Sequence, residues 1–205
     1  MKKFLVSISL GLFALMTTQC TTNNNQIDPF CGEYDTPHNT IPFDKISNKL
    51  YEPAFQKGVE LQVEEINAIV NQRSIPTFEN TIVALEESGS YLNRVASVFF
   101  ALQGAESDDE MMEISQRISP LLSEHSNNIS LNEQLFERIK YVYDRRAEMD
   151  LTPEQLMLVE RTYDSFATSG ANLEGEARER YRELSVKLSI NQYSLFPAKT
   201  EIASS

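Results

Sequence analysis

Apolar residues recur at helical spacing through most of this chain, and that pattern limits the possible folds more than any other feature. Between residues 50 and 71 they are three or four positions apart: Phe55, Val59, Val63, Ile66 and Val70. Such spacing places one apolar stripe along one side of an α-helix. No segment alternates apolar and polar residues for long enough to predict a β-strand. The sequence therefore predicts an all-α fold.

Five further helices are predicted, joined by short loops. The second should run from Pro76 and Thr77 to Gly104, with Gly89 inside it as either a weak point or a close contact. Its expected buried face consists of Phe78, Ile82, Leu85, Leu92, Val95, Phe99 and Leu102. The fourth helix is indicated by the spacing of Leu135, Ile139, Val142 and Tyr143.

Helix-capping residues predict where the third and fifth helices begin. Ser107 and Glu110 have capping-box spacing at the start of the third helix, which Pro120 should kink. The fifth should begin with the box Thr152, Pro153 and Gln155, and end at Gly170. The sixth is expected over residues 174–188. The apolar residues of the third and fifth helices are Met111, Ile114, Ile118, Leu121 and Ile129, and Leu156, Val159, Tyr163 and Phe166.

The N-terminal residues have the pattern of a secretory signal peptide. Lys2 and Lys3 precede a largely apolar run from Phe4 to Met16, which small and polar residues follow. The run is shorter than the about 20 apolar residues of a comfortable transmembrane helix. We therefore expect residues 1–19 to be cleaved after export across the membrane.

Cys20 follows the predicted signal peptide and is trailed by the polar residues TTNNNQ. The arrangement resembles a bacterial lipoprotein junction, in which the cysteine is acylated and a lipid anchors an otherwise soluble domain. Gln19 and Thr17 depart from the small and aliphatic residues usual at such junctions, so ordinary cleavage is the alternative. A disulfide between Cys20 and Cys31 in an oxidising compartment is a further possibility. Acylation and ordinary cleavage both place the chain in a bacterial cell envelope.

The remaining boundaries follow from composition. Residues 20–48 are predicted to form a tether and an extended arm, because prolines and a glycine interrupt any helical period. Residues 49–189 form the predicted helical domain. Residues 190–205 form a divergent tail, in which Pro197 stands where a helix would otherwise continue.

Charge limits the partners of the domain. The chain has 18 Lys and Arg against 30 Asp and Glu, a net charge of −12. Such a surface repels phosphate backbones and anionic lipid headgroups, so nucleic acid is excluded as an expected partner. Membrane contact is expected only through a lipid on Cys20.

Candidate catalytic and metal-binding residues are few. The chain has two histidines, and His38 and His125 are far apart in different kinds of segment, whereas zinc sites use closely spaced ligands. We expect His38 to face solvent from a loop and His125 to be a partly buried helix residue. Adjacent carboxylates point about 100° apart on a helix and are expected to be surface charges. These pairs are Glu64 with Glu65, Glu86 with Glu87, and Asp108 with Asp109. The residues alone therefore assign no catalytic, cofactor-binding or metal site.

Several short stretches of the arm and the first two helices are specific enough to identify a family. They are DPF at 28–30, EYDTP at 33–37, PFDKI at 42–46, LYEPAFQKGV at 50–59, PTFENTIVALEESG at 76–89 and VFFAL at 98–102. In order and spacing the chain resembles the N-terminal region of bacterial peptidyl-dipeptidases (dipeptidyl carboxypeptidases) of the thimet oligopeptidase, or M3, family. Looser similarity continues to about residue 189.

This resemblance implies a zinc metallopeptidase that removes C-terminal dipeptides from short peptides. In the family, a His-Glu-x-x-His helix and a later glutamate hold the zinc. No such motif occurs in these 205 residues, so no catalytic or zinc-binding role can be carried onto any of them. The resemblance implies that these helices shape the wall of a substrate channel, and we expect a chain truncated before its catalytic half. The alternative is a stand-alone envelope interaction module without catalytic activity.

Overall fold

The computed structural model describes residues 28–31, 34, 36–105 and 108–194, with side chains up to residue 188. The predicted signal peptide, Cys20, Ser107 and the tail beyond residue 194 lie outside these residues. The chain divides after Pro42 into an N-terminal unit and a larger unit that begins at Phe43. Each unit is described by itself.

The described part of the N-terminal unit consists of turns. Asp28 accepts hydrogen bonds from two backbone N–H groups, Phe30 N to its Oδ1 at 2.9 Å and Cys31 N to its backbone O at 3.1 Å. A single 3₁₀ turn, Pro37–Asn39, contains His38 at a φ of 60°. His38 is exposed, as predicted for a loop residue.

The larger unit is built from helices, and its described residues include no β-strand, so the prediction of an all-α fold is confirmed. Two 3₁₀ turns, η2 (Phe43–Lys45) and η3 (Asn48–Leu50), lead into the first helix. The helices are α1 (Tyr51–Val70), η4 (Phe78–Val83), α2 (Ala84–Glu87), α3 (Ser90–Ala105), α4 (Asp109–Ser130), α5 (Glu133–Arg145), η5 (Arg146–Glu148), α6 (Pro153–Phe166), η6 (Ala167–Ala171) and α7 (Gly175–Ser194). The elements η4 and η6 are single π-helical turns.

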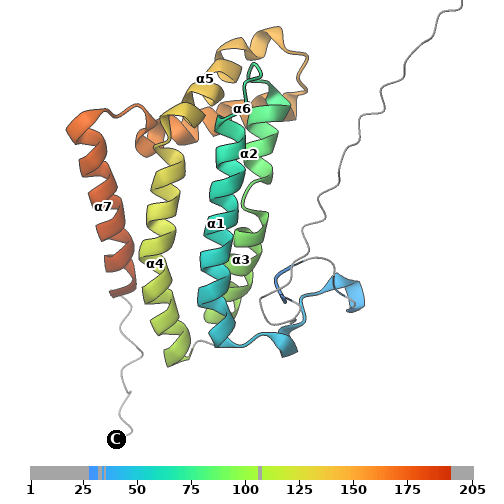
Figure 1. The fold of residues 1–205 in the computed structure, drawn as a ribbon, viewed down its shortest axis with the longest axis vertical. Helices are drawn as coiled ribbons and strands as arrows, with labels where there is room; N and C mark the ends of the chain where they lie inside the picture. Colours follow the sequence, from blue (N-terminus) through green and yellow to red (C-terminus); the bar gives the residue numbers. More distant parts are fainter. Residues whose placement is uncertain (1–27, 32–33, 35, 106–107, 195–205) are drawn as a thin grey trace, which may run out of the picture. The chain divides into compact units, whose positions relative to one another are not determined.

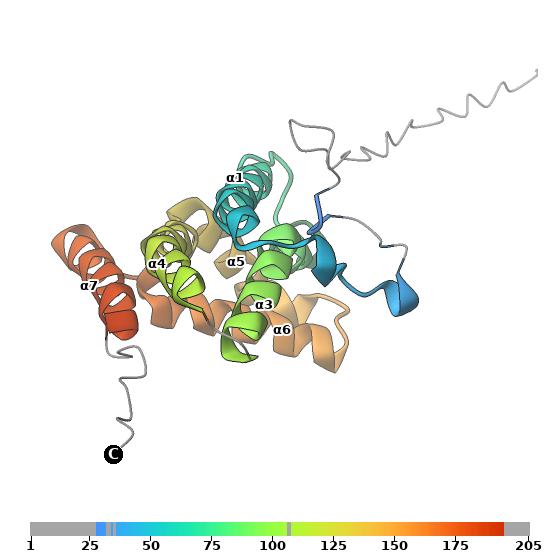
Figure 2. The ribbon, with the colours of Figure 1, turned by 90° about the horizontal axis from the view of Figure 1, so that it is seen from below.

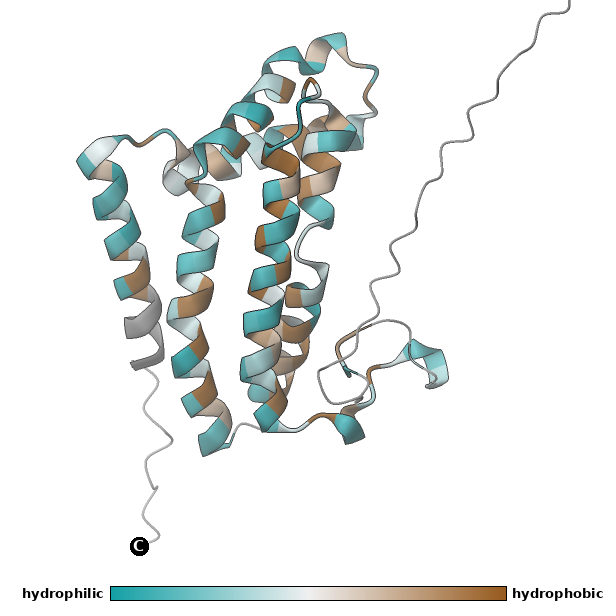
Figure 3. Cartoon of the chain, viewed as in Figure 1, coloured by the Kyte–Doolittle hydropathy of each residue, from teal (hydrophilic) through white to brown (hydrophobic). Residues whose placement is uncertain are grey.

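Helices α1, α3, α4 and α7 lie side by side, and α5 and α6 cross them at one end (Figure 1). The chain runs up α1, down α3, up α4 and finally down α7, while α5 and α6 cross the upper ends. The view along the helices shows α4 between α7 and α1 (Figure 2). Apolar residues concentrate on the sides where α1 and α3 face each other, whereas α7 is mostly hydrophilic (Figure 3). None of the described helices is long and apolar enough to cross a bilayer.

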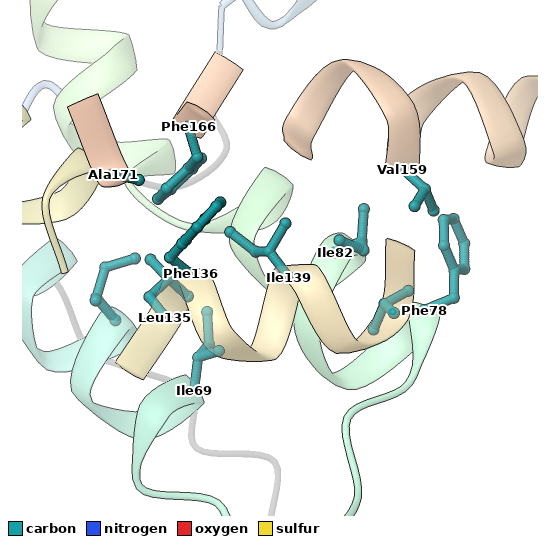
Figure 4. Packing of buried hydrophobic residues seen from close by; sticks show 11 residues of the cluster. Ile69, Phe78, Ile82, Leu135, Phe136, Ile139, Val159, Phe166 and Ala171 are labelled. Atoms are coloured by element: carbon teal, nitrogen blue, oxygen red, sulfur yellow. The ribbon is translucent and has the colours of Figure 1, made fainter. Parts of the chain in front are cut away.

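The main hydrophobic core lies where the end of α1 meets η4, α5 and α6 (Figure 4). Leu135, Ile139, Val142 and Val159 have no exposed surface there. The complete cluster is Ile66, Ile69, Phe78, Ile82, Leu135, Phe136, Ile139, Val142, Val159, Phe166 and Ala171. Full burial of each such side chain contributes about 1.5–3 kcal/mol, so this junction joins the crossing helices to the long ones.

Aromatic side chains join the first half of α1 to α3. Phe99 packs edge-to-face against Tyr51 and Phe55, with ring centroids 4.9 and 5.6 Å away. Gly58 lets the two helices approach closely, because a Cβ there would lie 3.0 Å from the Cα of Leu92.

Several sequence predictions need correction. Val63 is not on the buried stripe of α1, since its side chain is 42% exposed. The predicted capping box of Ser107 and Glu110 is wrong, because Asp108 caps α4 by accepting from the N–H of Met111 at 2.6 Å. Helix α4 continues through Pro120 as one element.

The helix ends also differ in part from the predictions. The second predicted helix is divided at Ser88 and Gly89, and α3 continues through Gly104 to Ala105. Thr77 caps its first turn, as predicted. The capping box of Thr152 and Gln155 is confirmed, and Gly170 turns the chain at a φ of 89°.

Candidate functional site

Arg138 on α5 forms a buried polar junction at the start of the second predicted helix. Its side chain is 8% exposed, and Nη1 donates to the backbone oxygens of Gln72 at 3.3 Å and Ser74 at 3.4 Å. Its Nη2 donates to Asn80 Oδ1 at 3.1 Å and Thr81 Oγ1 at 3.3 Å. One guanidinium therefore ties both the loop after α1 and the first turn of η4 to α5.

Asn80 is the second centre of this junction. Its Oδ1 accepts from the backbone N–H of Thr77 at 2.8 Å, and its own N–H donates to Thr77 Oγ1 at 3.1 Å. Its Nδ2 donates to the backbone oxygen of Ile75 at 2.9 Å. Because this amide serves as cap and as acceptor for Arg138, the first turn of η4 and the buried cation stabilise each other.

Among the described residues, no carboxylate forms an ion pair with Arg138. Burial lowers the pKa of Arg138, since a low dielectric disfavours the charged form. The carbonyls of Gln72 and Ser74 lie just beyond the C-terminus of α1, the end of a helix that favours positive charge. All described partners of the guanidinium are therefore neutral oxygens that position helices.

His125 on α4 is the centre of a second polar junction. It is buried, as predicted, and its Nε2 lies 2.8 Å from Gln62 Oε1 on α1. Gln62 Nε2 donates to Ser88 Oγ at 3.3 Å, at the break between α2 and α3. Beside it, the backbone N–H of Gly89 donates to Glu65 Oε2 at 2.6 Å. The break is thus anchored to α1, and through Gln62 to α4.

Gly89 is both a weak point and a close contact, the two possibilities that its sequence position offered. Its φ is +71°, in the left-handed region that favours glycine. A Cβ at this position would lie 2.3 Å from Gln62 Nε2. The amide of Gln62 therefore packs directly over the backbone of the break.

The predicted surface charges and the two histidines form no site together. The paired carboxylates Glu64 with Glu65, Glu86 with Glu87, and Asp108 with Asp109 are all exposed. Within the described ranges, no three His, Cys, Asp or Glu side chains lie close enough together to hold a metal ion. His125 is committed to Gln62 and is no part of a ligand cluster.

Two surface hollows of the described region are further candidate sites. One, of about 410 Å³, lies between the start of α1 and the start of α4. Two of its charged groups form an ion pair, Arg117 Nε with Glu52 Oε2 at 3.1 Å. The other, of about 310 Å³, lies between η4, α2 and α6. No histidine or cysteine lines either hollow, so neither offers an evident nucleophile and base.

Sequence reasoning missed Gln62 and Arg138, although a signal for both was present. Gln62 stands three residues after Val59 and four before Ile66, within the apolar stripe of α1. Arg138 likewise stands three residues after Leu135 and four before Val142. A polar residue at a buried helical position requires a hydrogen-bond partner in the core.

Comparison with known proteins gives close relatives. The chain is 40% identical over 147 residues to dipeptidyl carboxypeptidase of Escherichia coli, covering 72% of this chain and 22% of that protein. It is 38% identical over 160 residues to dipeptidyl carboxypeptidase of Salmonella typhimurium, covering 78% and 24%. Oligopeptidase A of Escherichia coli is 30% identical over 161 residues, again covering 78% and 24%.

The extent of these matches limits what they show. The chain spans less than a quarter of the length of these curated relatives, and the match falls on their N-terminal region. No family model matches the chain. The similarity therefore covers the helical region of this chain and only the N-terminal region of each relative.

Proposed function

The chain is homologous to the N-terminal region of the dipeptidyl carboxypeptidases of the M3 peptidase family, and we propose that it is the helical N-terminal part of a secreted or lipid-anchored zinc peptidyl-dipeptidase. Such an enzyme hydrolyses short peptides and releases C-terminal dipeptides. This region shapes the substrate channel and is inactive alone. The match to the Escherichia coli relative over 147 residues carries the proposal.

The polar groups of the described region support a positioning role. Arg138 and Asn80 hold η4 to α5, and Gln62 holds α4 to the helix break. These buried and half-buried groups bind other parts of the same domain, so they are committed to the geometry of the helices. A channel wall needs such rigidity because substrate-positioning elements must hold their shape to be effective.

Zinc is implied for the homologues as metallopeptidases. The described residues of this chain do not fit a zinc ion, since His125 is buried against Gln62 and no cluster of three potential ligands includes it. We therefore propose that the zinc ligands belong to the part of the enzyme outside the matched region. Metal-assisted hydrolysis then depends on that part for both the Lewis acid and the base.

The isolated chain is expected to bind no stoichiometric zinc and to release no dipeptides from short peptides. Metal analysis of the purified protein and mass spectrometry of peptide digests check both expectations, with the Escherichia coli relative as the active control. Chelator-sensitive release of dipeptides by the homogeneous chain would overturn the proposal.

Location is proposed from the N-terminal sequence. The predicted signal peptide sends the chain into the cell envelope, and acylation of Cys20 anchors it there by a lipid. Acylation and a Cys20–Cys31 disulfide exclude each other, because both consume the Cys20 thiol.

Cys20→Ser is expected to move the protein from the membrane fraction to the soluble fraction. A single acyl chain gives only marginal membrane binding, whereas a multiply acylated cysteine anchors stably. Fractionation of cells that produce each form measures the shift, and Cys31→Ser is the matched control that should stay with the membrane. Unchanged fractionation of Cys20→Ser would indicate ordinary cleavage and a periplasmic protein instead.

A further inference from the structure

The junction around His125 carries an inference that does not depend on the proposed enzyme. We propose that the contact between Gln62 and His125 is a pH-sensitive lock, which holds the helix break at Ser88 and Gly89 to α4 at neutral pH and releases it when His125 is protonated. The lock joins three elements through one amide side chain, that of Gln62.

The hydrogen bonds define which ring nitrogen of His125 carries the proton. Ser88 Oγ donates to the backbone oxygen of Leu85 at 2.7 Å, so it accepts from Gln62 Nε2. The amide nitrogen of Gln62 thus faces Ser88, and its Oε1 faces His125. Because an amide oxygen only accepts, His125 Nε2 must be the donor. The locked ring is the neutral tautomer with its hydrogen on Nε2.

Protonation would place a hydrogen on His125 Nδ1, where no described group accepts a hydrogen bond from it. His125 Nδ1 is buried, and no described group forms a hydrogen bond to it. A charged N–H left there without an acceptor is strongly disfavoured. Burial accordingly lowers the pKa of His125. The protonated ring reaches an acceptor only by leaving the site, which breaks its bond to Gln62.

Neighbouring charges do not substitute for the missing acceptor. Charged groups on the surrounding elements include Glu65 on α1, Glu86 and Glu87 on α2, Arg94 on α3, Glu124 on α4, and Arg178 and Arg182 on α7; η6 carries none. Glu65 binds Gly89, and Arg182 binds Asn128. The three other glutamates are exposed, and Arg178 pairs with Glu133. Burial, rather than any neighbouring charge, lowers the pKa of His125.

The direction of the pH effect follows from linkage. The unfolded or released ring titrates near its ordinary pKa of 6.5, and the locked ring titrates lower. The lock therefore contributes its full stability above about pH 6.5 and loses it as pH falls through the lower, locked pKa. Each unit by which the locked pKa is lowered corresponds to a tenfold change in the locking equilibrium.

Helix-break opening can be measured by hydrogen exchange of the full chain. The probe is the exchange of backbone amides in residues 85–93, corrected for intrinsic chemistry, from about pH 7.5 to about pH 5.5. His125→Gln keeps an amide donor for Gln62 but does not titrate. His38→Asn is the matched control, because asparagine tolerates the positive φ at this exposed position.

Wild type and His38→Asn are expected to show several-fold faster corrected exchange at the low-pH end, and His125→Gln is expected to show a flat profile. A histidine NMR titration of wild type should place the pKa of His125 below 6.5. An ordinary or raised pKa, or an unchanged pH dependence in His125→Gln, would overturn the lock. The titration needs no variant, so the test stands even if His125→Gln fails to fold.

Discussion

Replacing Arg138 by leucine is expected to lower the free energy of unfolding by about 3 kcal/mol or more. The change removes hydrogen bonds to Gln72, Ser74, Asn80 and Thr81 together. Leucine fills part of the space but donates to none of these oxygens, and of the four the oxygen of the fully buried Thr81 is the least accessible to water; a buried acceptor without a partner costs about 1–3 kcal/mol. Urea denaturation followed by the helical circular dichroism signal measures the loss.

Arg161→Leu is the matched control for this change. Arg161 is an exposed arginine on α6, and surface substitutions usually change stability by less than about 0.5 kcal/mol. If Arg138→Leu lost less than about 1 kcal/mol, water or rearranged side chains would satisfy the four oxygens, and Arg138 would not be the residue that holds η4.

The fold was predictable because most helices bury a regular stripe. Phe78, Ile82 and Phe99 all occupy the buried positions that their spacing predicted. The capping box of Thr152 and Gln155 was predictable for a similar reason, since both residues are close in sequence and need only each other. Local patterns of this kind do not depend on tertiary contacts.

The errors arose where tertiary contacts override a local pattern. Val63 fits the period of α1 but is exposed, and the polar Gln62 beside it turns toward the core to bind His125. Asp108 takes the cap of α4, and Glu110 instead accepts from Asn48 Nδ2 at 2.9 Å. Spacing alone could not choose between these neighbours.

The two polar junctions lay beyond local prediction for a different reason. Arg138 and Gln72 are 66 residues apart, and Gln62 and His125 are 63 apart. Only the packing of α4 and α5 against the α1 region brings each pair together. A polar residue within an apolar stripe signals that a partner exists but does not identify it.

Restoration of activity is the second large expected effect. A shortened Escherichia coli relative, lacking the region matched here, should release C-terminal dipeptides poorly, because without the proposed channel wall the substrate would be misplaced. Joining the helical domain of this chain to it should raise that rate by roughly 100-fold or more, the scale on which positioning affects catalysis. Because the two proteins are 40% identical over the matched region, we expect the helical domain of this chain to pack against the rest of the relative.

Gly89→Ala offers a control for this experiment, because it alters the packing of the helical domain and, in the proposed role, touches no reacting group. Alanine at a φ of +71° is strained, and its Cβ would displace the amide of Gln62. A hybrid enzyme carrying this change should fall short of the restored rate if the shape of the helices matters.

The most direct measurement compares dipeptide release by three samples at equal concentration: this chain alone, the shortened relative alone, and the hybrid of the two. We expect no release by the chain, weak release by the shortened relative, and strong chelator-sensitive release by the hybrid. Release by the chain alone, or a folded hybrid no faster than the shortened relative, would contradict this expectation.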